Sequence, residues 1–141
     1  MKSISKELLL QLPKVELHCH LDGSLRVSSI LDQAKIDNIK LPFKNYDDLT
    51  AYFKIGENRG SLEDYIRRFD ITLCVMQTPK ALSRFAYELI EDVSRENVRY
   101  IEVRYSPILH TKKGMALEEA LESVRKGLKR GEKDFGVKSG I

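Results

Sequence analysis

The chain has 141 residues, of which 42% are hydrophobic and 32% are charged, and its formal net charge is +3. This composition is typical of one globular domain, and the small, evenly spread charge excess argues against a nucleic-acid-binding patch or a membrane-surface helix. The early apolar run at 8–10 is too short for a secretory signal or a membrane span. We therefore expect a cytoplasmic protein in which Cys19 and Cys74 are reduced thiols.

Periodicity divides the chain into alternating strands and helices. In order, it predicts a strand at 14–20, a tight turn at 21–24, a helix at 27–37, a short helix after Asn45, a polar loop at 55–60, a helix at 61–76, a helix from Pro79 through Val93, a strand at 98–105, a helix at 117–135, and a strand beginning at 137. The expected helix caps are Ser24, Asn45, Ser61 with Asp64 in a capping-box arrangement, Thr78 before a proline, and Gly136.

Alternation of this kind predicts an α/β fold with a parallel sheet covered by outer helices. Residues 1–141 then form one segment of a single domain, because only about two and a half strands are present. A sheet of that size has unprotected edges and a small core. We expect the chain to be truncated, and to self-associate or to be partly disordered through its uncovered apolar surface.

The first strand carries the pattern with the clearest chemistry, His18-Cys19-His20. Side chains two residues apart on a strand share a face, so both imidazoles converge while Cys19 points to the opposite side. Zinc accepts histidine nitrogen, and working residues of parallel α/β barrels lie at the carboxyl ends of strands. Two histidines at this spacing also occur on strands that bind no metal, and two ligands do not complete a zinc site.

Three further polar residues follow the second predicted strand or lie on it. His110 comes just after the strand without any ligand spacing around it, which predicts an exposed loop residue. Glu102 and Arg104 share one face of that strand, opposite its apolar side chains. We expect them to point into the barrel and to form a structural ion pair, with direct catalysis as the less favoured alternative.

Two stretches resemble the adenosine deaminases of the metal-dependent amidohydrolase superfamily. The opening motif is Pro13-Lys-Val-Glu-Leu-His-Cys-His-Leu-Asp-Gly-Ser-Leu-Arg26, and Val98-Arg-Tyr-Ile-Glu-Val-Arg-Tyr-Ser-Pro107 resembles the second barrel strand of that family. The similarity extends over essentially the whole chain. It implies that the α/β segment is the N-terminal part of a TIM-type (β/α)8 barrel, with a purine nucleoside as substrate.

The resemblance also implies roles for individual residues. His18 and His20 match the first two zinc ligands, and His20 additionally lines the nucleoside site. Asp22 matches the acidic residue that binds the ribose 5′-hydroxyl; related adenine deaminases usually carry glutamate there. Tyr65 and Phe69 match aromatic positions of the helix over the active site, although simple core packing is an equally good reading of their spacing.

In the full-length family, the implied reaction is zinc-dependent hydrolytic deamination of adenosine, and of deoxyadenosine, to inosine and ammonia. The remaining ligands and the proton-shuttle glutamate belong to downstream motifs that these 141 residues do not contain, so no catalytic residue is assigned here. We expect the chain alone to be inactive. The alternatives are a non-catalytic fragment, an adenine deaminase-like protein or a histidine-rich phosphoesterase.

Overall fold

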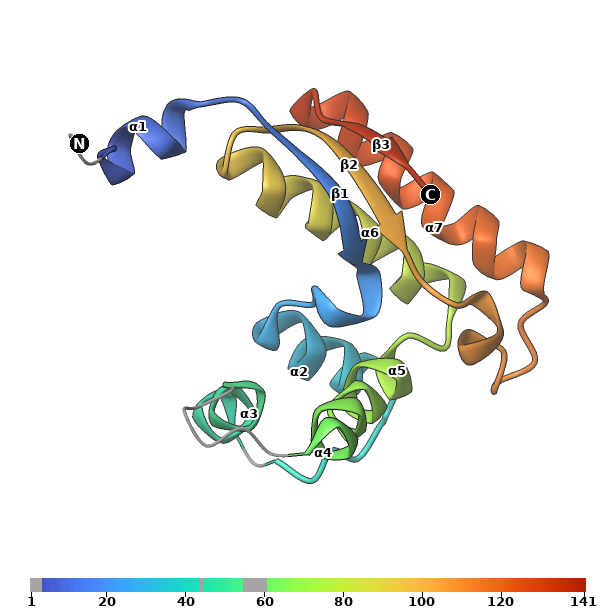
Figure 1. Ribbon diagram of the computed structural model, residues 1–141. Helices are drawn as coiled ribbons and strands as arrows, with labels where there is room; N and C mark the ends of the chain where they lie inside the picture. The colour runs from blue at the N-terminus through green and yellow to red at the C-terminus, as the bar shows by residue number, and fades with distance from the viewer. Residues whose placement is uncertain (1–3, 44, 55–60) are drawn as a thin grey trace.

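The computed structural model describes residues 4–43, 45–54 and 61–141 and has an α/β architecture (Figure 1). In chain order the elements are α1 (Lys6–Gln11), β1 (Lys14–His20), the 3₁₀ turn η1 (Leu21–Gly23), α2 (Val27–Ile36), α3 (Tyr46–Phe53), α4 (Leu62–Arg67), α5 (Phe69–Val75), α6 (Pro79–Arg95), β2 (Val98–Arg104), the 3₁₀ turn η2 (Pro107–His110), α7 (Leu117–Phe135) and β3 (Lys138–Gly140).

The three strands form one parallel sheet in the order β1-β2-β3. Helices α6 and α7 lie side by side behind the sheet, whereas α2 to α5 gather beyond the arrowheads of the strands (Figure 1). His20 pairs with Arg104, so the carboxyl ends of β1 and β2 meet at the same edge. This arrangement places the histidine-bearing end of β1 next to the α2–α5 group.

The core lies between the sheet and the two long helices. On β2, Ile101 and Val103 are almost completely buried, and they face α6, which contributes Phe85 among its buried side chains. Helix α7 approaches α6 closely because Gly127 and Gly131 stand at the contact: an added Cβ at Gly131 would lie 2.7 Å from the Ile90 Cβ. Apolar burial from three neighbouring elements therefore holds the sheet and helices together.

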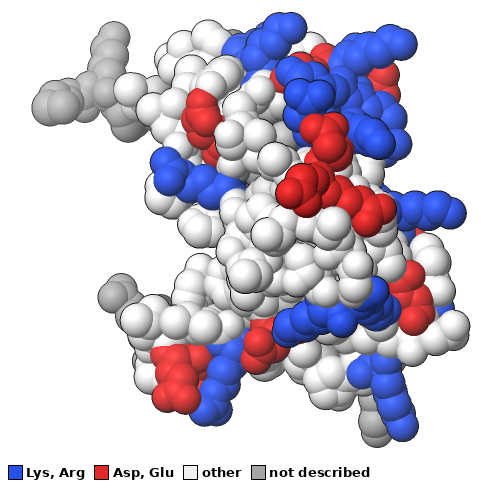
Figure 2. All heavy atoms as spheres, turned by 90° about the vertical axis from the view of Figure 1, so that its right-hand side faces the viewer, with Lys and Arg blue, Asp and Glu red and all other residues white. Residues whose placement is uncertain are grey.

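The solvent face of α7 is highly charged and carries both signs. Arg125 and Glu122 approach to 3.2 Å, and Lys129 and Glu132 to 2.8 Å, each at an i,i+3 spacing. On the face shown in Figure 2, basic and acidic side chains accordingly lie next to one another. The Arg125–Glu122 pair is exposed and contributes little stability, whereas the Glu132 side chain is only 10% exposed. In the part of the chain that the structure describes, no helix is long and apolar enough to cross a membrane.

Most of the predicted boundaries are confirmed. The first strand at 14–20 and the helix at 117–135 have the expected bounds, and the Asn45 side chain caps α3 by accepting a hydrogen bond from the Asp48 N–H. Thr78 caps α6 by accepting from the Ala81 N–H, with a proline at the first helical position. Gly136 ends α7 with φ of 73°, the left-handed conformation that glycine adopts without strain.

Two local predictions are wrong. The helix predicted at 61–76 is two helices, α4 and α5, which meet at Arg68, although the capping box of Ser61 and Asp64 is present. Ser24 does not cap α2: its hydroxyl donates to the His20 carbonyl instead, at 2.6 Å, and Arg26 occupies the N-cap position. The short α1 was not predicted, and the predicted loop at 55–60 lies outside the described residues.

Candidate functional site

The carboxyl end of β1 brings His18 and His20 together as predicted. Their Nε2 atoms lie 3.2 Å apart and their ring centroids 5.2 Å apart, because strand alternation sends both side chains to one face. The His20 side chain is about half exposed, at 54%. His18 is exposed as well, so the Nε2 atoms of both histidines are accessible from the same side of the sheet edge.

The turn η1 places an acidic side chain directly beside this pair. Asp22 is buried, and its Oδ1 lies 3.8 Å from Nδ1 of His20. Among the described residues, that Oδ1 has no hydrogen-bond donor. A buried carboxylate oxygen without a donor costs free energy, so this atom is suited to accept a hydrogen bond from a ligand.

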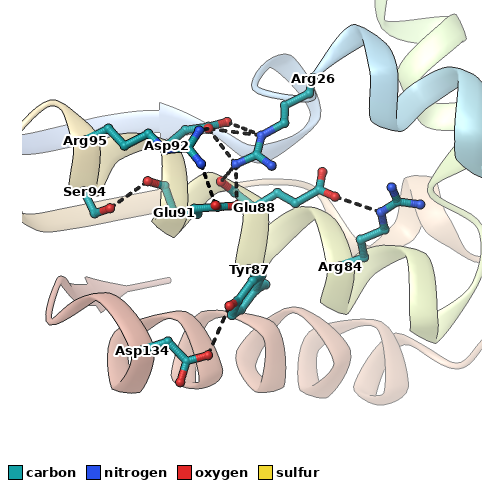
Figure 3. Close-up of polar contacts among 9 residues, drawn as sticks. All are labelled: Arg26, Arg84, Tyr87, Glu88, Glu91, Asp92, Ser94, Arg95 and Asp134. Atoms are coloured by element: carbon teal, nitrogen blue, oxygen red, sulfur yellow. Dashed lines mark hydrogen bonds and ion pairs between the residues drawn. The ribbon is translucent and has the colours of Figure 1, made fainter.

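The turn is fixed from both ends. The Ser24 hydroxyl donates to the His20 carbonyl, and the Ser24 N–H donates to the Leu21 carbonyl at 3.1 Å. On the far side, Arg26 donates to both carboxylate oxygens of Asp92 and to Glu91 on α6, at 2.6–3.0 Å (Figure 3). These hydrogen bonds raise the pKa of the guanidinium above its already high ordinary value. The segment that carries His20 and Asp22 is thus anchored to the outer helix.

A cavity of about 220 Å³ opens beside η1, and it brings together Asp22, Tyr65 and Phe69. The two aromatic rings pack edge to face, with centroids 5.6 Å apart and an interplanar angle of 76°. An added Cβ at Gly23 would touch the Phe69 ring at 3.5 Å. The cavity is lined by Asp22, Gly23, Leu25, Val27, Phe53, Tyr65, Arg68, Phe69 and Thr72. The histidine pair is adjacent through the chain and is not part of this lining.

The geometry of the two imidazoles fits two ligands of one zinc ion. Nitrogens bound to tetrahedral zinc at about 2.0–2.1 Å lie about 3.3–3.4 Å apart. The observed separation of 3.2 Å between the His18 and His20 Nε2 atoms is close to that value. Within the described residues, no group of three or more His, Cys, Asp or Glu side chains is placed to hold a metal ion. The described residues therefore offer a two-histidine arrangement that is compatible with zinc and no complete metal site.

A protein-family model described as "Adenosine deaminase" matches residues 13–141. The chain belongs to the adenosine deaminase family. Curated adenosine deaminases agree: one from Clostridium botulinum is 52% identical over 131 residues, and one from Clostridium perfringens is 47% identical over 133 residues. These alignments cover 93% and 94% of this chain but only 40% of each relative. The chain thus spans about two fifths of the length of these members of the adenosine deaminase family.

Solved structures show the same relation in three dimensions. An adenine deaminase from Arthrobacter aurescens superimposes with a TM-score of 0.79 at 27% identity, over 89% of this chain and 37% of that one. An amidohydrolase from Burkholderia ambifaria with bound Zn also gives 0.79, at 25% identity over 98% and 38%. These neighbours are TIM-barrel amidohydrolases. The predicted fold class, an α/β part of a TIM-type barrel with outer helices, is confirmed.

His110 contradicts the prediction of an exposed loop residue in this adenosine deaminase-family chain. It is the last residue of η2 and is completely buried, and its Nδ1–H donates to the Met76 carbonyl at 3.1 Å. Its ring lies 5.5 Å from that of Tyr105, and its Nε2 has no partner among the described residues. Burial lowers the pKa of His110, while the Met76 hydrogen bond and the charge of Asp22 oppose that shift. The neutral imidazole is therefore a core residue, and the short loop around it hid this from spacing arguments.

The predicted Glu102–Arg104 ion pair is also wrong. Glu102 accepts a hydrogen bond from the Tyr100 hydroxyl, which holds the pKa of that tyrosine above its usual range, and Arg104 is exposed. No ion pair joins Glu102 to Arg104 in the described ranges. Gly140 on β3 leaves room for the glutamate, since an added Cβ there would lie 2.6 Å from its carboxylate. Tyr100 and Arg104 are both two residues from Glu102, so spacing does not distinguish them, and pairing by charge selected the wrong one.

Proposed function

We propose that this chain carries the first part of the active site of a zinc-dependent deaminase that converts adenosine, and deoxyadenosine, to inosine and ammonia. The observation that supports this most strongly is the His18–His20 pair, whose Nε2 atoms are 3.2 Å apart, beside the buried acceptor Asp22. The remaining zinc ligands and the proton-shuttle glutamate are expected from the parts of the family that this chain does not span. The whole reaction therefore needs residues beyond those described here.

His18 and His20 would hold the zinc ion, and the bound metal would supply an activated water for attack on the purine. Asp22 faces Nδ1 of His20 at 3.8 Å, and a nearby carboxylate favours the proton on Nδ1. That tautomer leaves the lone pair of Nε2 free to bind metal. The same Asp22 oxygen, Oδ1, would therefore face the metal ligand His20 and accept a hydrogen bond from substrate.

The cavity supports a nucleoside rather than a free base. Tyr65 and Phe69 form an apolar aromatic wall, and Asp22 supplies one buried acceptor at its end. A ribose hydroxyl can donate to that acceptor. Aspartate is shorter than the glutamate expected of adenine deaminases and leaves more room for the sugar. An adenine deaminase is among the structural neighbours, so free adenine is the competing substrate to test.

Zinc retention tests the metal assignment without any need for turnover. We expect His18→Ala and His20→Ala each to retain less zinc than wild type, measured by mass spectrometry after incubation with zinc, because one remaining imidazole binds more weakly than the pair. His110→Asn is the matched control, since it removes the third histidine of the chain and leaves this pair intact. Stoichiometric zinc in the doubly substituted chain would refute the assignment.

Activity and assembly are tested separately. Chromatography of adenosine incubated with the zinc-loaded 141-residue chain should show no inosine, because the general acid–base residue is not among these side chains. We also propose that the chain is cytoplasmic. We propose in addition that it self-associates, because Val15 and Leu17 on β1 are 61% and 62% exposed. Light scattering that gives only a monomer would contradict self-association. Phosphatase activity without deamination would favour a phosphoesterase instead.

A further inference from the structure

We propose that Arg68 is a substrate-binding residue that recognises a sugar hydroxyl together with Asp22, an inference that rests on the proposed function. Both side chains line the 220 Å³ cavity. Each carries one buried atom without a partner among the described residues: the acceptor Oδ1 of Asp22 and the donor Nη1 of Arg68. Two residues of one cavity lining therefore carry an acceptor and a donor without partners, both buried, so that a ligand would reach them only after a small side-chain movement.

The break between α4 and α5 separates the environments of two neighbouring arginines. Arg67 is exposed and donates to Glu63 at 2.7 Å, an ordinary i,i+4 surface pair. Arg68 stands at the junction itself, its guanidinium 5.9 Å from the ring centroid of Tyr52 on α3. It forms no ion pair with the described carboxylates. A partly buried guanidinium that faces a cavity without a carboxylate partner is available to bind a ligand.

A hydroxyl group is the ligand chemistry that fits both atoms at once. It donates one hydrogen bond, which Asp22 Oδ1 accepts, and its oxygen accepts one, which Arg68 Nη1 donates. A phosphate would satisfy Arg68 but would bring a second anion against the Asp22 carboxylate. The remaining lining is apolar or aromatic, including Leu25, Val27 and Phe53, and suits the carbon face of a sugar. The substrate class is therefore a hydroxylated, uncharged nucleoside.

The test compares adenosine with adenine, because only adenosine has the sugar. Calorimetric titration of the zinc-loaded chain with each ligand would be run on wild type, Arg68→Met, Arg68→Lys and Arg67→Met. We expect Arg68→Met to weaken adenosine binding about tenfold or more while adenine changes less than about twofold. Arg68→Lys should recover part of the loss, since it keeps a charged donor. Arg67→Met should bind both ligands as wild type does.

Four outcomes would overturn the inference: equal weakening of adenosine and adenine in Arg68→Met, wild type that binds adenosine no more tightly than adenine, wild type that binds neither, or adenosine 5′-monophosphate bound more tightly than adenosine through Arg68. Circular dichroism of each variant checks the fold, and Arg68→Lys carries the test if Arg68→Met does not fold. Failure of the proposed function has a different signature, namely zinc kept after loss of both histidines. Sugar discrimination through Arg68 and zinc retention through β1 can therefore succeed or fail independently.

Discussion

At the contact between α6 and α7, helix propensity and packing predict opposite effects of one substitution on stability. Gly127 lies inside α7, where alanine is favoured over glycine by about 1 kcal/mol on helix propensity alone. In the folded chain, however, an added Cβ would lie 2.8 Å from the Ala86 Cβ and 2.9 Å from the Ser83 carbonyl carbon, and closer still to the Ser83 oxygen. Gly127→Ala therefore forces the two helices apart.

The magnitude follows from these two opposing effects. Overpacking of a core costs about 1–3 kcal/mol, and the upper end applies here because the obstructing atoms are the Ser83 backbone and the Ala86 Cβ, none of which is the end of a flexible side chain. Subtracting the propensity gain of about 1 kcal/mol leaves a net loss of about 2 kcal/mol in the free energy of unfolding. A loss of that size corresponds to a fall of about 4–8 °C in the melting temperature for a chain of this length.

Urea unfolding followed by far-ultraviolet circular dichroism measures this loss directly. The matched control is Lys126→Ala, one position earlier on the exposed face of α7, which should change stability by less than about 0.5 kcal/mol. If Gly127→Ala were as stable as wild type or more so, helix propensity would outweigh the contact. The close approach of α7 to α6 would then be refuted.

Two further predictions concern His110 and Arg26. Burial lowers the pKa of His110 in the folded chain, so the unfolded chain binds more protons below about pH 6.5, and stability should fall as the pH is lowered through that range. His110→Asn, which keeps a donor for the Met76 carbonyl, should flatten this part of the curve; an unchanged curve would contradict the assignment. Arg26→Met should lower the free energy of unfolding by about 1–2 kcal/mol, discounted for partial exposure, because its hydrogen bonds to α6 are charge-assisted. The exposed pair of Arg125 is the control: Arg125→Met should change stability by less than about 0.5 kcal/mol, and an equal loss in both variants would show that the Arg26 contacts have no special role.

What could be predicted from the sequence was mostly local. The strand that holds His18 and His20 has a period of two, so their shared face follows from spacing alone. The caps at Asn45, Thr78 and Gly136 depend on one residue and its immediate neighbours, and all three are present. Asp22 was assigned beside the histidines from the opening motif, and the structure places it there.

What could not be predicted depends on contacts between distant segments. The burial of His110 is decided by the Met76 carbonyl, 34 residues earlier in the chain, which no local pattern reveals. The helical period continues unbroken across Arg68, yet the chain divides into α4 and α5 there. Arg68, which we propose as a substrate-binding residue, was not singled out from the sequence for the same reason. It lies three residues after Tyr65, on the same helical side, and that spacing was the one available signal.

The short distance between His20 and Asp22 has a thermodynamic consequence. In the proposed site, the His20 imidazole would bind the metal through Nε2, and its Nδ1 lies 3.8 Å from Oδ1 of Asp22, which lines the cavity. Two ligands bound through such neighbours are linked, and linkage is reciprocal. If bound zinc changes the affinity for the nucleoside by some factor, the bound nucleoside changes the affinity for zinc by the same factor. If zinc tightens nucleoside binding, chains with bound nucleoside would therefore bind zinc more tightly by the same factor.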